Sequence, residues 1–202
     1  MGEKGLQTKI NWFGLVGSIT VFVLIIISMF VPWWQLTVGD DIVTANVSPL
    51  NTNFNFIGDL FTIPLIIALN IASIISLSAG GIVMLIYSVK PEKSYSKRLL
   101  GFAYKKPLYS VLLFVISLLL ITILVKSLFS LDFPLSGSLT STLPTDMTQG
   151  ITLSVLMTAG FQWPFILATV AAGFCIAARV YHKKISPIKV VQPTPRSASS
   201  IK

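Results

Sequence analysis

Long apolar runs separated by polar segments dominate the pattern along this chain. The runs that are nearly free of charge cover residues 12–32, 60–89, 108–129 and 160–181. About 20 apolar residues in a helix are enough to cross the hydrocarbon core of a bilayer. The pattern therefore predicts an all-α membrane protein, a bundle of four transmembrane helices within residues 1–185.

The first run has two interpretations. Lys4 and Lys9 give it the basic start of a signal peptide, but its apolar stretch is long for a signal. Residues 30–33, Phe-Val-Pro-Trp, also offer no small residues for cleavage. We therefore expect an uncleaved membrane anchor.

The segments between the runs form two predicted outer loops, residues 33–59 and 130–159. In the first loop, β-prone residues 35–38 and 42–44 flank a Gly-Asp turn, which predicts a short β-hairpin. In the second, the apolar stretch 151–160 either extends the fourth helix through a kink at Pro164 or lies in the membrane interface. A glycosylation sequon at Asn46 is followed by Pro49, so whether it is used stays open.

Basic residues are sorted to one side of this four-span arrangement. Charged residues make up 11% of the chain, against roughly 25% in soluble domains. Of the 15 Lys and Arg, 14 fall on the side of the two termini and the middle loop: Lys4, Lys9, Lys90, Lys93, Lys97, Arg98, Lys105, Lys106, Arg179, Lys183, Lys184, Lys189, Arg196 and Lys202. Because short cytoplasmic loops are enriched in Lys and Arg, both termini are predicted to be cytoplasmic. The charges then suit membrane orientation and anionic headgroups rather than nucleic acid, and residues 186–202 are predicted to be a disordered basic tail.

Small residues recur at helical spacing in two of the predicted spans: Ala68, Ala72, Ser76, Gly80, Gly173 and Ala177. Small side chains let membrane helices approach closely. These residues are predicted to mediate helix packing, either within this chain or with a partner subunit or second copy. Aromatic residues near the ends of the runs are predicted to anchor the spans at the interface: Trp33, Trp34, Trp163 and Tyr181.

Polar groups near membrane depth are costly and therefore candidates for function. Asp59 and Lys126 fall at similar depth, so they either pair or share a hydrated vestibule, or sit separately as a helix cap and a snorkelling lysine. Asn70 lies deeper and is expected to hydrogen-bond to another helix or, alternatively, to line a permeation path.

Groups that would perform catalysis do not form a recognisable pattern in this sequence. His182 is the only histidine, which excludes a multi-histidine metal or haem site, and Cys175 is the only cysteine, which excludes an internal disulfide. We therefore expect no enzyme activity, no metal and no cofactor.

The four spans, the β-like first outer loop that opens with Trp33 and Trp34, and the short basic loop resemble the general plan of claudin-type tetraspan proteins. Claudins carry a Trp, a Gly-Leu-Trp motif and two cysteines in that loop, and this loop lacks that motif and both cysteines. No functional residue is carried over from the resemblance. The sequence thus predicts a non-catalytic structural or accessory subunit in the cell membrane, with a membrane-protein partner or homo-oligomer. The rival hypothesis is an oligomeric small-solute or ion transporter or channel.

Overall fold

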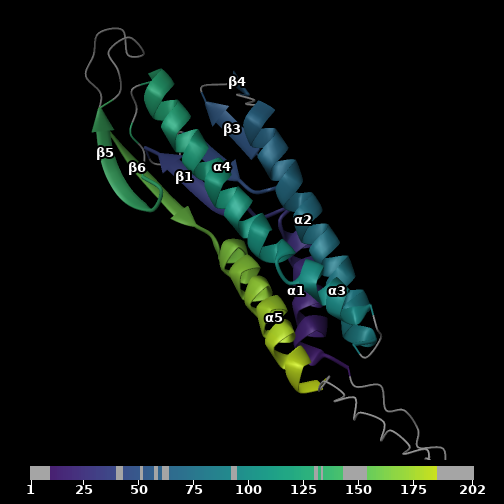
Figure 1. Cartoon of the computed structure of the whole chain (residues 1–202). Coiled ribbons are helices and arrows are strands. Elements are labelled where there is room, and N and C mark those ends of the chain that lie inside the picture. Colours follow the sequence, from purple (N-terminus) through teal and green to yellow (C-terminus); the bar gives the residue numbers. More distant parts are fainter. Residues whose placement is uncertain are drawn as a thin grey trace, which may run out of the picture.

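Five α-helices and six β-strands form the part of the chain that a computed structural model describes, residues 10–39, 43–50, 52–56, 59–60, 64–91, 95–129, 132, 134–142 and 154–185. The helices are α1 (Trp12–Ile27), α2 (Pro64–Val89), α3 (Ser96–Ala103), α4 (Lys106–Phe129) and α5 (Trp163–Ile185). The strands are β1 (Trp34–Val38), β2 (Val43–Val47), β3 (Thr52–Phe56), β4 (Asp59–Leu60), β5 (Gly137–Thr142) and β6 (Ser154–Phe161). The helices lie side by side and the strands gather at one end of them (Figure 1). The predicted tail, 186–202, lies outside the described residues.

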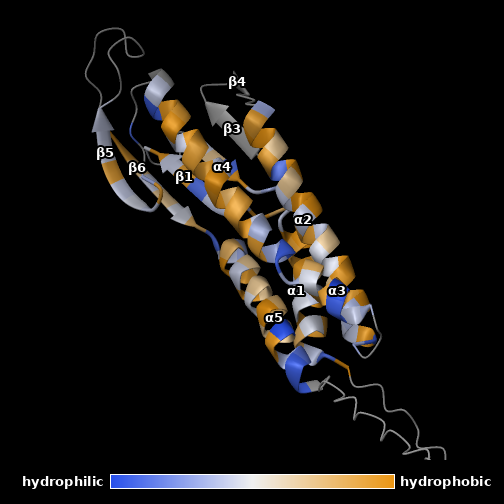
Figure 2. Cartoon of the chain, in the orientation of Figure 1, coloured by the Kyte–Doolittle hydropathy of each residue, from blue (hydrophilic) through white to orange (hydrophobic). Residues whose placement is uncertain are grey.

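Three helical segments are long and apolar enough to cross a membrane: Pro64–Val89, Ser96–Ser127 and Trp163–Lys184. Apolar residues occur along most of the length of these helices (Figure 2), and large apolar residues are exposed on each of them, such as Ile75, Leu112 and Val170. Helix α1 is shorter, with 16 residues, although turns continue from it until the N–H of Val31 donates to the carbonyl of Ile27. Helical backbone therefore begins where the first apolar run does but becomes irregular before Pro32.

The sheet has six strands in the order β4-β3-β2-β1-β6-β5, and its paired strands are antiparallel (Figure 1). Strands β1 and β2 pair from Trp34–Val47 to Val38–Val43, which confirms the predicted hairpin. The expectation of an otherwise all-α fold was wrong, because the second predicted loop adds β5 and β6 to the same sheet.

Strand β6 occupies most of the stretch predicted to extend the fourth helix or to lie in the interface, and α5 begins only at Trp163. Burial alternates along β6: Met157 and Ala159 are buried, whereas Ser154, Leu156 and Thr158 are exposed. This is the two-residue period of a strand. The sequence hid it because apolar Leu156 is on the exposed face and small Ala159 on the buried one.

One face of the sheet packs on the helices and makes the larger core. Trp34, Val47 and Met157 from the sheet belong to one buried cluster with Phe114, Leu118 and Ile121 of α4. Leu36 and Val38, two and four residues after Trp34 and so on the same face of β1, pack against the same cluster. The sheet and helices therefore share a core and form one folding unit.

Helix α4 is displaced along α2 toward the strands. Ser73 of α2 lies against Ser110 of α4, and Ser76 donates to the carbonyl of Lys106, so the antiparallel α4 begins beside the middle of α2. Below it, α3 continues the same column along the remaining part of α2, with Ser96 bonded to the carbonyl of Lys90. We call the end with the strands the sheet end and the end with α3 the basic end.

The displacement lengthens the exposed apolar belt of the bundle. From Ser73, α2 runs about 24 Å to Val89 at the basic end, and from Ser110, α4 runs about 20 Å to Ile123 at the sheet end. Val89 and Ile123 are 47% and 62% exposed. The belt is therefore about 44 Å tall, compared with about 30 Å for a bilayer core.

Candidate functional site

The sheet is attached to the bundle at a junction built around Trp33 and Trp34. Both indoles are 0% exposed, and Trp33 packs against Phe114 with 5.0 Å between ring centroids and 59° between the ring planes. The indole N–H of Trp33 donates to Ser28 Oγ at 2.7 Å, and that of Trp34 donates to the carbonyl of Leu135 at 2.8 Å. The prediction that these two residues anchor the protein at the membrane interface was wrong, because both side chains lie inside the protein.

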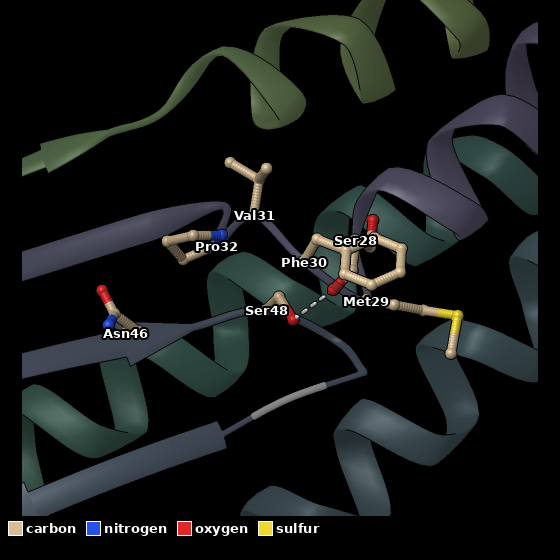
Figure 3. Close-up of a pocket in the computed structure, with 7 residues that line it drawn as sticks. All are labelled: Ser28, Met29, Phe30, Val31, Pro32, Asn46 and Ser48. Carbon is tan, nitrogen blue, oxygen red and sulfur yellow. Dashed lines mark hydrogen bonds between the residues drawn. The ribbon is translucent and has the colours of Figure 1, made fainter.

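A small pocket of about 80 Å³ opens beside this junction, between residues 28–32 and strand β2 (Figure 3). Ser48 and Asn46 contribute its polar groups; Ser48 Oγ donates to the carbonyl of Ser28 at 3.1 Å. The buried Oδ1 of Asn46 has no hydrogen-bond partner among the described residues. A volume of this size suits a few ordered water molecules, which would satisfy Asn46.

A seam of hydroxyl groups joins α2 to α4. Ser73 Oγ lies 2.6 Å from Ser110 Oγ and donates to the Ser110 carbonyl at 3.0 Å. Asn70, one helical turn nearer the sheet end, is 4% exposed, so its side chain lies inside the protein. Farther along α4 in the same direction, the hydroxyl of Ser117 is buried and has no partner among the described residues.

At the basic end, Asn11 joins three helices. Its Nδ2 donates to Tyr87 Oη on α2 at 2.8 Å and to the carbonyl of Ala178 on α5 at 3.0 Å, while its Oδ1 accepts from the N–H of Gly14 as the N-cap of α1. Because Tyr87 accepts from Asn11, its own proton is available to His182 Nδ1, 2.9 Å away. The sequence analysis missed Asn11 and Tyr87 and left His182 without a partner; an amide directly before an apolar helix was the available signal.

Basic and aromatic side chains meet where α3 approaches α5. The guanidinium carbon of Arg179 lies 4.2 Å from the ring centroid of Tyr104, and Lys105 Nζ lies 5.7 Å from the same centroid. Lys106 Nζ lies 4.6 Å from the centroid of Phe102. The side chains of Lys105 and Lys106 therefore point back toward α3, which places their charges nearer the basic end.

The predicted packing residues divide between buried and exposed positions. Ser76 and Gly80 are buried against the start of α4, where a Cβ on Gly80 would lie 2.6 Å from Lys106 Cβ. Ala68, Ala72 and Gly173 are exposed. Ala177 is partly buried, and the buried face of α5 instead carries Ala168, Ala171, Ala172, Cys175 and Ala178.

The other predicted site residues are placed as follows. Lys126 Nζ lies 2.7 Å from Asp132 Oδ1, the acid just beyond the end of α4. The backbone of Asp59, in β4, pairs with that of Phe56, in β3, and Asp59 lies five residues before the first residue of α2. The side chain of Asp59 is outside those described. Trp163 is 51% exposed and Tyr181 partly buried, positions that suit the predicted anchors.

Groups of three or more metal-binding side chains do not occur within the described residues. No protein-family model matches the chain, and no curated protein matches it. The functional argument therefore depends on the chain's own surfaces and clusters.

Proposed function

We propose that this chain is a non-catalytic tetraspan protein of the cell membrane, with both termini cytoplasmic, that serves as a structural or accessory subunit of a membrane assembly. In this proposal α1 with its following turns, α2, α3–α4 and α5 are the four spans. The sheet end is then outside the cell, and the basic end faces the cytoplasm, as the distribution of Lys and Arg favours.

The observation that carries the proposal is the height of the apolar belt. Fitting a belt of about 44 Å into a core of about 30 Å requires a tilt of about 47°, beyond the roughly 0–40° range of membrane helices. About 14 Å of apolar surface is therefore left outside the hydrocarbon. Exposed apolar surface of this kind is typical of a contact with another protein.

We place the apolar surface that is left outside the hydrocarbon on the half of α4 nearest the sheet. At the basic end, α1, α2 and α5 all expose large apolar residues, such as Val16, Ile86 and Val180, which is the arrangement that surrounding lipid would cover. At the sheet end, α4 exposes Leu119 and Ile123 beyond the level where α1 ends and α5 begins. We infer that a membrane-protein partner, or a second copy of this chain, covers this part of α4.

Photo-crosslinking in native membranes tests this inference. A benzophenone amino acid at Ile123 should give a protein adduct of defined mass, whereas the same group at Ile86, an exposed isoleucine near the basic end, should react with lipid. Absence of a protein adduct at Ile123, together with a monomer mass after mild solubilisation, would overturn the proposal.

A second candidate, an oligomeric transporter or channel, is favoured by the buried polar seam of Asn70, Ser73, Ser110 and Ser117. Solute or ion flux in proteoliposomes that disappears on Asn70→Leu would support it. The matched variant Thr122→Val, which removes a hydroxyl bonded only within α4, should leave such flux unchanged.

A further inference from the structure

Three cations from three segments gather at the seam between α3 and α5. Arg179 comes from α5, Lys105 from the turn before α4 and Lys97 from the first turn of α3. Arg179 and Lys105 share the ring of Tyr104, at 4.2 and 5.7 Å from its centroid. Lys97 is close enough to His182, the neighbour of this seam on α5, to interact with it electrostatically.

No acidic residue balances these charges within the described part of the basic end, which carries Lys90, Lys97, Arg98, Lys105, Lys106, Arg179, Lys183 and Lys184. The ion pair found among the described residues, Lys126 with Asp132, lies at the sheet end. Clustered cations repel one another, so an arrangement like this is stabilised when an anion binds between them. Basic pockets between membrane helices are typical binding sites for anionic headgroups.

The surroundings of the seam indicate which kind of anion fits. A guanidinium binds the oxygens of a phosphate through two parallel N–H donors, and a lysine adds a point charge. Ile176 and Val180, within one helical turn of Arg179 on α5, expose apolar surface. A ligand that fits both features carries a phosphate and apolar chains.

We propose that the α3–α5 seam, formed by Arg179 and Lys105 at the ring of Tyr104 with Lys97 seven residues earlier on α3, binds the phosphate headgroup of an anionic phospholipid. The acyl chains then lie along the exposed apolar face of α5. Because the site is formed within one chain, it does not depend on the subunit role proposed above.

Lipid exchange followed by native mass spectrometry tests the site. The purified protein is equilibrated with vesicles of phosphatidylcholine containing a series of phosphatidylglycerol fractions, and bound phosphatidylglycerol is counted. Arg179→Gln and Lys105→Gln should each weaken its binding about fivefold, and together more strongly. Lys184→Gln, on the same helix but away from the Tyr104 ring, should change it less than twofold.

Further variants and a free anion separate this site from its alternatives. Arg179→Lys should retain part of the affinity, because it keeps the charge and loses the two parallel donors, and an unchanged melting temperature shows that the variant is folded. Inorganic phosphate at millimolar concentration should not displace the lipid. The proposal is overturned if Lys184→Gln weakens binding as much as Arg179→Gln, or if inorganic phosphate displaces the lipid.

Discussion

Asn11 is the residue at which three helices converge. It is 0% exposed, it caps α1, and its amide nitrogen reaches both Tyr87 and Ala178. A buried amide that uses its donors and its acceptor holds α1, α2 and α5 in one register, because moving any of the helices would leave a polar group unpaired. Asn11 is therefore more important for the assembly of the bundle than for chemistry.

Replacing Asn11 tests this role. Asn11→Leu removes the cap and leaves Tyr87 Oη and the Ala178 carbonyl without their donor. We expect a loss of about 2–4 kcal/mol in the free energy of unfolding, measured as a lower midpoint in detergent unfolding. Thr20→Val, which removes a hydroxyl bonded only to the carbonyl of Val16 on the same helix, should have almost no effect.

Glycines in the bundle differ in the space around them. A Cβ on Gly81 would lie 2.8 Å from Cγ1 of Val21, which is fully buried, whereas a Cβ on Gly173 would meet nothing within 4 Å. Gly81→Ala should therefore separate α1 from α2 and cost about 1–3 kcal/mol. Gly173→Ala should stabilise α5 by about 0.5–1 kcal/mol, because alanine favours helix.

Thermal unfolding of the two glycine variants, side by side in one detergent, measures both effects. The melting temperature should fall for Gly81→Ala and hold or rise for Gly173→Ala. A fall of similar size in both would mean that Gly173 is also packed, which would point to a contact with another chain.

The sheet is the element that distinguishes this fold from a plain helical bundle. Its inner face carries the apolar side chains of Trp34, Val47 and Met157, which share one buried cluster with residues of α4. Trp33 lies at the point where the chain passes from the α1 segment into the sheet. Its indole packs against the ring of Phe114 and donates a hydrogen bond to Ser28 Oγ. The Trp33 side chain therefore helps to fix the position of the sheet relative to the helices.

Trp33→Ala should leave a large cavity at that junction and remove the donor to Ser28 Oγ, whose hydroxyl still donates to the carbonyl of Leu24. We expect it to destabilise the protein by about 3–5 kcal/mol. Trp163→Ala, at a side chain that is 51% exposed, is the matched control and should cost much less. Limited proteolysis of the sheet, together with the unfolding midpoint, measures the difference; equal effects of the two substitutions would contradict the structure at the junction.

At the level of the whole molecule, the sheet end and the basic end should face opposite sides of the membrane. In a Cys175→Ala background, cysteines are introduced one at a time at Lys97 on α3 and Thr140 on β5, which are both exposed. An impermeant thiol reagent added to intact cells should label the cysteine at 140 and not the one at 97, until the membrane is opened. Labelling of both in intact cells would contradict the proposed orientation.

Apolar run lengths, which indicate whether a segment is better covered by lipid or by water, were sufficient to locate α1, α2, α4 and α5 to within about five residues. They did not locate α3, which lies in the segment predicted to be a short basic loop. Local turn chemistry around Gly39 was sufficient for the β1–β2 hairpin. Strand β6 was not predictable in the same way, because it pairs with β1, more than one hundred residues earlier, and short apolar stretches satisfy helix and strand patterns equally. The burial of Trp33 and Trp34, the pairing of Lys126 with Asp132 and the gathering of Arg179, Lys105 and Lys97 were likewise decided only in three dimensions. Hydrophobicity is a property of each residue and can be read along the chain, whereas a contact depends on which distant segments the folded chain brings together.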